Sequence, residues 1–244
     1  MTLPDTLLSL AGRVAVVAGG AGGIGSAIAS LLRRAGATVV CLDRPGHEGP
    51  AGTRTIACDL TRSAEVDAAL SGVRLADGRL DIVVHAAGTT RDGVIWKIAD
   101  DDWADVMRVN LDSAFFLMRA AVPHLRELGG GAVVLVSSIN GERGKVGQSN
   151  YAASKAGLNG LARSAAREVG RFGIRVNVVA PGWVDTAMTR ALADEVKARA
   201  RSERVLEAPT APEDVAGVVL FLASPLARQV TGQVLRVDAG QLIG

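Results

Sequence analysis

The feature that most constrains the fold is a run of glycines that follows a short apolar segment near the N-terminus. Residues 13–18 read Arg-Val-Ala-Val-Val-Ala, which is typical of a buried strand, and glycines dominate residues 19–25. A helical pattern then runs to a stop at Gly36. Glycine allows a tight turn and the close approach of a pyrophosphate, and the start of a helix attracts negative charge. A strand, a glycine loop and a helix in this order predict the first half of a βαβ unit that binds a nucleotide.

Two glycine spacings in this segment match patterns of dinucleotide-binding loops. Gly20-x-Gly22-x-x-Gly25 fits the general fingerprint, and Gly19-x-x-x-Gly23-x-Gly25 fits a wider-spaced variant. The chain has 29 glycines, so the spacing alone is weak support. The position between a strand and a helix favours nucleotide binding over a plain turn.

An acidic residue ends the second strand-like run and bears on the choice of nucleotide. Asp43 closes residues 38–43 and lies 18 residues after Gly25, and recognition of a ribose 2′-hydroxyl is expected about 20 residues on. Its carboxylate can accept hydrogen bonds from the ribose of NAD and would repel the 2′-phosphate of NADP. Arg44 could instead pair with that phosphate, and a turn formed by the two residues needs no ligand at all. We expect NAD to be preferred over NADP.

Runs of β-type residues alternate with helical patterns along the chain, and no shift in composition marks a second domain. The strand-like runs are residues 13–18, 38–43, 53–59, 80–88, 132–137, 174–180 and 233–237. Helical patterns between them include residues 101–109, 111–128, 152–168 and 212–222. This alternation predicts an α/β chain: a doubly wound Rossmann fold, with a seven-stranded parallel sheet and helices on both faces. We expect a single domain over residues 1–244, in which the charged stretch 186–204 forms a helical flap at the substrate.

Composition argues against several classes of protein. Hydrophobic residues make up 48% of the 244 residues, and the formal net charge is only +2. No basic run is long enough to follow a phosphate backbone, so nucleic acid is not an expected partner. No apolar run approaches the roughly 20 residues of a membrane span, and no secretory signal stands at the start. We therefore expect a cytoplasmic protein in which Cys41 and Cys58 are buried, reduced thiols.

The three histidines are scattered, which argues against a metal site. His47 lies in a loop rich in proline and glycine, His124 falls within a helical pattern, and His85 lies inside a strand-like run. We expect His85 to be packed in the core.

Tyr151, the only tyrosine, stands four residues before Lys155, one of four lysines. Both open a run of helix formers that follows a glycine-rich loop, so their side chains share one helix face. An ammonium near a phenol favours the phenolate, and we expect the pKa of Tyr151 to fall below its usual value of about 10. Such a phenol can exchange a proton with an alcohol or a carbonyl oxygen. The alternative is a tyrosine at a helix start with a lysine packed beside it.

From about residue 10 to the C-terminus, the chain resembles the short-chain dehydrogenases/reductases of the single-domain kind. The motifs that carry the resemblance are the loop glycines Gly19, Gly23 and Gly25, then Asp59-Leu60, Ala87-Gly88, Asn110, Ser138, Tyr151-x-x-x-Lys155, Pro181-Gly182 with Thr186, and Val230-Thr-Gly232. Within the family it is most similar to 3-oxoacyl-thioester reductases and their catabolic relatives, through Thr89-Thr-Arg-Asp-Gly93, Asp102-Trp103 and Val109-Asn-Leu111.

The resemblance implies four catalytic residues. Tyr151 would exchange the proton with the substrate oxygen, and Lys155 would lower its pKa and hold the nicotinamide ribose. Ser138 would hydrogen-bond the substrate oxygen, with the neighbouring Ser137 as a weaker candidate. Asn110 would shape a helix kink and hold a water in a proton relay to Lys155.

The resemblance also implies a set of cofactor contacts. Asp59 and Leu60 would flank the adenine, Ile24 would lie against the cofactor at the loop, and Thr186 with Val184 would hold the nicotinamide carboxamide. With the two catalytic residues that touch the cofactor, the full expected set is Gly19, Gly22, Gly23, Ile24, Gly25, Asp43, Arg44, Asp59, Leu60, Ala87, Gly88, Tyr151, Lys155, Pro181, Gly182, Val184 and Thr186.

The sequence departs from the family pattern at three positions. Ala18 stands where a threonine usually precedes the first loop glycine, and His85 stands where the family has the first of two asparagines, so two tethering hydrogen bonds are lost. Members that use NADP often carry a basic residue before the second conserved glycine, where this chain has Gly22. The last departure agrees with Asp43 in favouring NAD.

The pocket wall and the assembly are expected from weaker signals. The candidate substrate residues combine apolar and amide side chains without a charged anchor: Trp96, Ser138, Asn140, Val146, Gln148, Trp183 and Met188. The alternative is that these side chains only pack. The long Ala/Leu faces of the helices over residues 110–125 and 151–170 pair across subunits in this family, which implies a homotetramer; burial against the sheet uses part of the same faces.

Three functions compete. The first is an NAD-dependent dehydrogenase of a small secondary alcohol, or the ketone reductase in the reverse direction, which Asp43 favours. The second is an NADPH-dependent reductase of a 3-oxoacyl-[acyl-carrier-protein] or 3-oxoacyl-CoA, which the overall pattern favours. Carrier docking would need a basic patch, for which Arg126, Arg167 and Arg171 are available. The third is a nucleotide-sensing regulatory protein without catalysis, which the complete set of four catalytic residues argues against.

Overall fold

The computed structural model describes residues 8–190 and 193–243, and of residues 187 and 188 it describes the backbone alone. The described chain forms the predicted parallel sheet of seven strands, ordered β3-β2-β1-β4-β5-β6-β7. Its strands are β1 (Val14–Ala18), β2 (Thr38–Asp43), β3 (Arg54–Ala57), β4 (Ile82–His85), β5 (Gly131–Val136), β6 (Ile174–Pro181) and β7 (Val234–Val237). Both edge strands are short, at four residues each.

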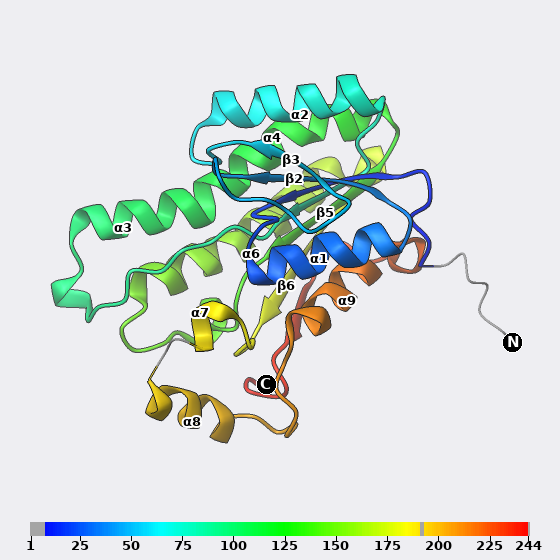
Figure 1. Cartoon of the computed structure of the whole chain (residues 1–244). Coiled ribbons are helices and arrows are strands. Elements are labelled where there is room, and N and C mark those ends of the chain that lie inside the picture. Colours follow the sequence, from blue (N-terminus) through cyan, green and yellow to red (C-terminus); the bar gives the residue numbers. More distant parts are fainter. Residues whose placement is uncertain (1–7, 191–192, 244) are drawn as a thin grey trace, which may run out of the picture.

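Helices cover both faces of the sheet, as predicted (Figure 1). One face carries α1 (Gly23–Arg34) and α9 (Pro212–Ala223), which pack against each other. The other face carries α2 (Ser63–Asp77), α4 (Ser113–Glu127) and α6 (Ser149–Val169). The stretch expected to form a flap contains α7 (Ala187–Arg190) and α8 (Asp194–Ser202), and Figure 1 shows α8 standing apart from both helical layers.

Alternation along the strands explains why the sheet is buried on both sides. In β1, Val14, Val16 and Ala18 join the core under α2, α4 and α6, whereas Ala15 and Val17 join the core under α1 and α9. Parallel strands that are buried on both faces read as continuous apolar runs, and the whole of β1 is buried. The unbroken apolar run at residues 13–18 therefore reflects burial of alternate side chains in two different hydrophobic cores.

The order of the strands places a crevice above the middle of the sheet. The chain runs outward from β1 through β2 to the edge strand β3, then crosses back to lay β4 on the other side of β1. Connections leave β1 and β4 in opposite directions, and in open parallel sheets ligands bind at this switch point, outside the carboxyl ends of the strands. All the predicted catalytic residues belong to segments that reach this end of the sheet.

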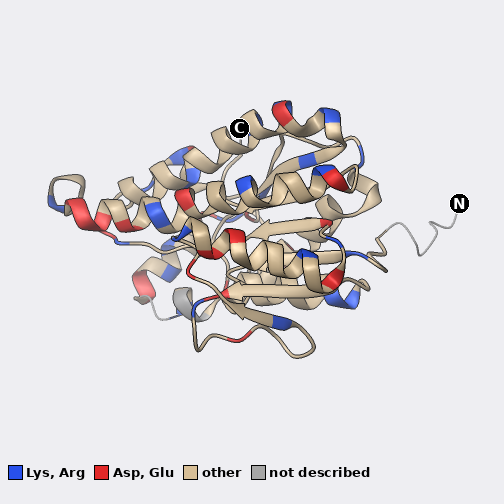
Figure 2. Cartoon of the chain, turned by 90° about the horizontal axis from the view of Figure 1, so that it is seen from above, with Lys and Arg blue, Asp and Glu red and all other residues tan. Residues whose placement is uncertain are grey.

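The helix that precedes α4 differs from the prediction. We expected two separate helices, one before and one after Asn110. Instead α3 (Asp100–Met107) continues through one π-helical turn (Arg108–Asp112) directly into α4. The three aspartates of the first turn of α3 suit the positive end of a helix dipole, and they stand out at the left of Figure 2. Elsewhere in that view basic and acidic residues are interspersed.

A buried carboxylate joins the amino ends of β1 and β4. Asp81 accepts hydrogen bonds from the Val14 nitrogen at 2.9 Å, from Arg13 at 2.8 Å and from Arg79 at 2.6 and 2.8 Å. Burial acts to raise the pKa of Asp81, but the hydrogen bonds from Arg79, Val14 and Arg13 outweigh it, and the pKa lies below the usual value. The carboxylate thus fixes the register at the end of the sheet that is remote from the crevice.

We expect Asp81→Asn to lower the free energy of unfolding by about 2–4 kcal/mol at pH 7, because it removes the charge between two arginines. A depressed pKa in the folded state stabilises the protein above the unfolded pKa of about 3.9, and this contribution is lost as the pH falls through the folded pKa. Urea unfolding at pH 7 and at pH 3 should therefore show a difference between the two proteins that shrinks in acid. Asp67→Asn, in an exposed pair with Arg119 at 3.9 Å, is the control and should change stability by less than about 0.5 kcal/mol.

Candidate active site

Packing explains several of the loop glycines. Gly19 has a φ of +80°, and a Cβ atom there would lie 2.6 Å from the Ala87 nitrogen. A Cβ atom at Gly25 would collide with the carbonyl oxygen of Gly19. Gly22 and Gly23 meet no such backbone obstacle, and both line the crevice. The loop therefore needs glycine at its ends to fold and presents its bare middle to the crevice.

The carboxylate of Asp43 is tied to this loop. Its Oδ2 accepts a hydrogen bond from the Ala21 nitrogen at 3.0 Å, and its Oδ1 accepts one from the Arg44 nitrogen at 2.9 Å. The Arg44 side chain is exposed. The acid at the end of β2 is thereby held beside the glycine loop, where the sequence placed it.

The residues expected at the adenine have contacts of their own. Asp59 accepts hydrogen bonds from the hydroxyl and the nitrogen of Thr61, at 2.7 and 3.0 Å. The Thr61 hydroxyl lowers the pKa of Asp59 below its usual range. Leu60 is buried in the core beneath α2 and α4. Neither residue lines the main cavity of the described chain.

Asn110 lies buried in the π-helical turn and joins two segments. Its Oδ1 accepts from the Thr89 nitrogen at 2.8 Å, and its Nδ2 donates to the Thr89 oxygen at 3.0 Å and to the Ser154 hydroxyl at 2.9 Å. The side chain thus fastens the loop after β4 to α6. A backbone that widens by one residue in this turn carries the amide to both partners.

Lys155 is buried in α6, and its ammonium reaches the end of β5. The Nζ donates to the carbonyl oxygen of Val136 at 2.9 Å and lies 5.6 Å from the centre of the Tyr151 ring. Burial lowers the pKa of Lys155 to about 8. A Cβ atom at Gly88 would meet the Nζ at 3.3 Å and the Asn110 Oδ1 at 3.4 Å, so the small residue there lets both side chains approach.

The expected effect on the Tyr151 phenol is wrong in direction. Burial raises the pKa of Tyr151 above 10, and the nearby charge of Asp92 acts in the same direction. A hydrogen bond with the side chain of Ser138 opposes them without prevailing. The ammonium of Lys155 is directed at Val136, and the desolvation of the phenol is the larger influence, so the tyrosine is protonated at neutral pH.

The two adjacent serines have different partners. The Ser138 hydroxyl hydrogen-bonds the Tyr151 side chain and accepts from the Asn140 nitrogen at 3.2 Å. The Ser137 hydroxyl instead donates to the carbonyl oxygen of Lys155 at 2.8 Å and is buried. Of the two, Ser138 faces the tyrosine, in agreement with the preference drawn from the sequence.

A cavity of about 1110 Å³ brings most of the predicted residues together. The predicted residues on its wall are Gly22, Gly23, Ile24, Gly25, Gly88, Ser138, Asn140, Val146, Gln148, Tyr151, Lys155, Pro181, Gly182, Trp183, Val184 and Thr186. Those off the wall are Gly19, Asp43, Arg44, Asp59, Leu60, Ala87, Trp96 and Asn110. Trp96 is 78% exposed on the short turn Ile95–Lys97, outside the cavity. The side chain of Met188 lies outside the described residues.

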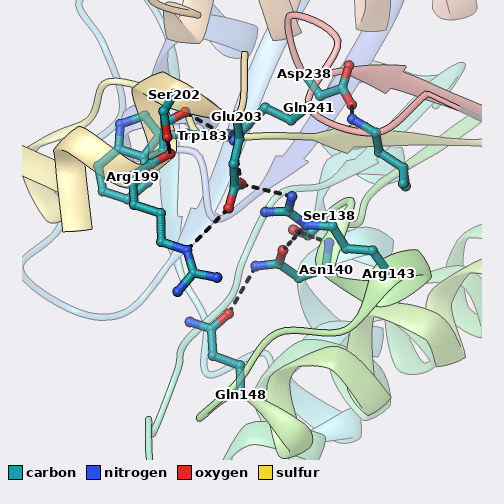
Figure 3. Close-up of polar contacts among 12 residues, drawn as sticks. Ser138, Asn140, Arg143, Gln148, Trp183, Arg199, Ser202, Glu203, Asp238 and Gln241 are labelled. Atoms are coloured by element: carbon teal, nitrogen blue, oxygen red, sulfur yellow. Dashed lines mark hydrogen bonds and ion pairs between the residues drawn. The ribbon is translucent and has the colours of Figure 1, made fainter. Parts of the chain in front are cut away.

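Six charged or amide residues on the cavity wall were missed (Figure 3 shows four of them): Asp92, Arg143, Lys145, Arg199, Glu203 and Gln241. Gln241 accepts from the Trp183 nitrogen at 2.6 Å and so packs the C-terminal loop against the wall. Arg199 and Glu203 stand four apart in α8 and its end, a spacing visible in the sequence. We expected no charged anchor in the pocket, and these residues overturn that expectation.

His85 is packed in the core, as predicted. The Ser113 hydroxyl donates to the Val109 oxygen at 2.6 Å and lies 2.7 Å from the His85 Nε2, so the Nε2 carries the proton. Burial, reinforced by the charge of Lys155, lowers the pKa of His85 to about 3, and the ring is neutral. The hydrogen bond from His85 to Ser113 thus ties β4 to α4 at the position where the family pattern has an asparagine.

Two other kinds of site are absent from residues 8–190 and 193–243. No three side chains of the His, Cys, Asp or Glu type are grouped so that they could hold a metal ion. No helix in these ranges has the length and apolar composition needed to cross a bilayer. Both thiols, Cys41 and Cys58, are free and buried.

Known oxidoreductases are similar to this chain along nearly its whole length. A protein-family model described as "Enoyl-(Acyl carrier protein) reductase" matches residues 19–241. The chain is 37% identical over 240 residues to the 3-oxoacyl-[acyl-carrier-protein] reductase FabG of Salmonella typhimurium, covering 96% of this chain and 98% of the relative. It is 39% identical over 232 residues to the acetoacetyl-CoA reductase of Synechocystis, covering 95% and 97%. A solved short-chain type dehydrogenase/reductase from Mycobacterium ulcerans superposes with a TM-score of 0.91 at 30% identity, covering 96% and 90%.

The contacts of Asn110 lead to a prediction about the integrity of the site. Asn110→Ala removes the partners of both backbone groups of Thr89 and of the Ser154 hydroxyl, and we expect the free energy of unfolding to fall by about 2–3 kcal/mol. Thermal unfolding measures the loss, and hydrogen exchange should show the amide of residue 89 opening faster. Asn159→Ala is the control, because it removes a different buried side-chain amide, one that belongs to α6. It should leave the exchange of residue 89 unchanged. An Asn110 variant as stable as the parent protein would contradict the tethering role.

Proposed function

The chain belongs to the short-chain dehydrogenase/reductase family of oxidoreductases, and we propose that it transfers a hydride between NAD(H) and a secondary alcohol or ketone. The observation that carries the proposal is the meeting of the Ser138 hydroxyl, the Tyr151 phenol and the Lys155 ammonium in one cavity with the bare glycine loop. Asn110 completes the set as a tether that holds the loop after β4 against α6.

The residues present fit a dinucleotide cofactor. Gly22 and Gly23 offer a surface without side chains at the start of α1, where a pyrophosphate is favoured. Thr186 and Val184 line the same cavity, where a Cβ atom at Gly23 would lie 3.2 Å from the Thr186 side chain, and the Lys155 ammonium lies beside Gly88. When bound, a nicotinamide ring supplies the acceptor or donor of the hydride. The remaining cofactor contacts are proposed for Gly19, Gly25, Ile24, Arg44, Asp59, Leu60, Ala87, Pro181 and Gly182.

Tyr151 would handle the proton. In reduction its phenol donates a proton to the carbonyl oxygen as negative charge develops there, while the Ser138 hydroxyl donates a second hydrogen bond to the same oxygen. Because burial holds the pKa of Tyr151 above 10, the donor form is fully populated at neutral pH. In oxidation the phenolate is needed, so the rate of that direction should rise with pH. Lys155 would help to stabilise that phenolate and bind the cofactor ribose.

NAD is the proposed cofactor, because Asp43 stands fixed beside the glycine loop with one oxygen on Ala21 and the other on Arg44. A carboxylate in this position suits two ribose hydroxyls and opposes a phosphate. The alternative is an NADPH-dependent reductase of 3-oxoacyl thioesters, which the similarity to a 3-oxoacyl-[acyl-carrier-protein] reductase and an acetoacetyl-CoA reductase supports. The family relation itself leaves both open.

We also propose one domain with a flap over residues 186–204, a cytoplasmic location and a homotetramer. The exposed faces of α4 and α6 would supply the subunit contacts, and Phe115 of α4, at 44% exposure, gives that face an apolar side chain. The expected substrate is a free small molecule, bound at Ser138, Asn140, Val146, Gln148 and Trp183.

Tyr151→Phe tests the proton step. The ring is kept, so NADH binding should be unchanged, whereas kcat should fall by about 10²–10⁴-fold because the proton donor is gone. Steady-state rates with a ketone substrate and a titration of NADH fluorescence measure the two effects. A variant that keeps full activity would remove Tyr151 from the mechanism.

Asp43→Asn tests the choice of cofactor. It should weaken NADH binding by about tenfold, or about 1.4 kcal/mol, and strengthen NADPH binding, since a negative charge no longer faces the 2′-phosphate. Fluorescence titration with both nucleotides gives the ratio of the dissociation constants. Asp59→Asn, which removes a neighbouring charge already bonded to Thr61, is the control. If Asp59→Asn alters the ratio as much as Asp43→Asn does, ribose recognition by Asp43 is ruled out.

A further inference from the structure

Two guanidinium groups from separate elements converge on one carboxylate inside the substrate cavity (Figure 3). Arg143 of α5 (Asn140–Arg143) contacts the Oε2 of Glu203 at 2.9 Å, and Arg199 of α8 contacts its Oε1 at 3.5 Å. Gln241 of the C-terminal loop donates to the same Oε2 at 3.4 Å. Donors from three segments thus form a receptor for an anion, which the chain's own glutamate fills.

The receptor is held in place by contacts that lead back to the reacting groups. The Arg143 Nε donates to the Asn140 Oδ1 at 3.1 Å, and the Asn140 nitrogen donates to the Ser138 hydroxyl at 3.2 Å. The Asn140 Nδ2 donates to the Gln148 Oε1 at 3.0 Å. Arg143 is therefore preorganised at a fixed position relative to the oxygen that would bind the carbonyl.

Helix α8 separates two environments. Val196, Arg199, Ala200 and Glu203 lie on the substrate cavity. The other face sends basic side chains to a second cavity of about 580 Å³, lined among others by Lys197, Arg201 and Arg204. The two faces carry the same kind of charge, so a substitution on one can be matched by the same substitution on the other.

The charge balance of the flap is positive even with Glu203 included. Residues 186–204 contain five basic and three acidic residues, an excess equal to the +2 of the whole chain. On the substrate cavity, beyond the reacting groups, the cations are Arg143, Lys145 and Arg199 and the acids are Asp92 and Glu203. The Asp92 carboxylate already accepts from Gln148 at 3.1 and 3.2 Å. Glu203 is thus the carboxylate that offsets the two arginines.

We propose that Arg143 and Arg199 form a subsite for an anionic tail of the substrate, which Glu203 occupies when no such tail is bound; the proposal rests on the ketone reductase function above. The side chain of Glu203 is 30% exposed and that of Arg199 is 80% exposed. The carboxylate can therefore turn to water without becoming a buried, unpaired charge. A carboxylate or phosphate can take a bidentate hold on guanidinium, which Glu203 lacks on Arg199.

The consequence is a substrate class. The enzyme should prefer ketones and secondary alcohols that carry a carboxylate or a phosphate at some distance from the reacting carbon. Neutral ketones would enter the same cavity but would leave the Arg143–Glu203 pair in place.

The test uses ketone pairs that differ only in the charge of the tail. S-acetoacetyl-4′-phosphopantetheine against S-acetoacetylpantetheine tests a phosphate, and a 3-oxo diacid monoester against its diester tests a carboxylate. We expect kcat/KM to be at least tenfold higher for the charged member of one pair, and that pair identifies the anion. Arg143→Gln and Arg199→Gln should each remove most of the preference, and Glu203→Gln should increase it several-fold. Because the preference is a ratio of kcat/KM for two ketones, a change in activity common to both members cancels from it.

Arg201→Gln is the matched control, because it makes the same change on the opposite face of α8. If the parent protein shows equal kcat/KM for the charged and the neutral member in both ketone pairs, the proposal is overturned. Equal losses on both members in the arginine variants would also overturn it, as would a loss of preference in Arg201→Gln alone, which would place the anion in the second cavity. NADH binding and circular dichroism check that Arg143→Gln is folded; Arg199 is exposed and tests the subsite independently.

A binding measurement keeps the subsite separate from the reductase function. Calorimetry with 4′-phosphopantetheine and pantetheine, and with the monomethyl and dimethyl esters of glutarate, needs no turnover; saturating NADH keeps the cofactor site filled. If the protein reduces no ketone but binds a charged ligand in an Arg199-dependent way, the subsite stands and the proposed reaction fails. If it reduces ketones but binds charged and neutral ligands equally, the reaction stands and the subsite fails.

Discussion

The buried ammonium of Lys155 is the constraint on which the rest of the site depends. An amine taken out of water needs a partner, and here it is the Val136 carbonyl at the end of β5, at 2.9 Å. That single bond requires α6 to lie close to the sheet, which the Ser137 hydroxyl secures through the backbone of Lys155. It also requires room above β4, which Gly88 supplies. Burial then lowers the pKa of Lys155 to about 8, so the ammonium is held at some cost and can respond to charge brought beside it.

The architecture was predictable because its signals are local. Strands buried on both faces give unbroken apolar runs, helices between them give a period near 3.6, and glycine marks the loop where backbones touch. The pairing of Tyr151 with Lys155 was also predictable, since both lie on one helix turn, whereas Ser138 was expected from family resemblance. Asn110 came only from family resemblance, because nothing near it in the sequence indicates that its partners are Thr89 and Ser154.

What the sequence could not reveal depends on contacts between distant segments. The direction of the shift in the Tyr151 pKa is set by burial, whereas spacing alone suggested that the ammonium would decide it. Trp96 was attractive as a pocket residue because of its type, yet its turn projects away from the cavity. Arg143 and Glu203 stand 60 positions apart, so their pairing follows only from the way α8 returns over α5. The π-helical turn places Asn110 where its side chain can bond Thr89 and Ser154. Helix propensity does not predict such a turn.

The manner in which α8 is attached has an evolutionary consequence. It contributes no strand to the sheet, and Ala200 is the only buried residue described within it. Its links to the body are side-chain contacts with Arg143 and Gln241, and the following chain holds to the Ala239 oxygen through the nitrogens of Val205 and Leu206. Substitutions at the exposed positions of this helix therefore leave the two hydrophobic cores and the residues of the hydride chemistry alone. Related genes can diverge in the substrates that their products accept through substitutions in these nine residues, at little risk to the stability of the protein.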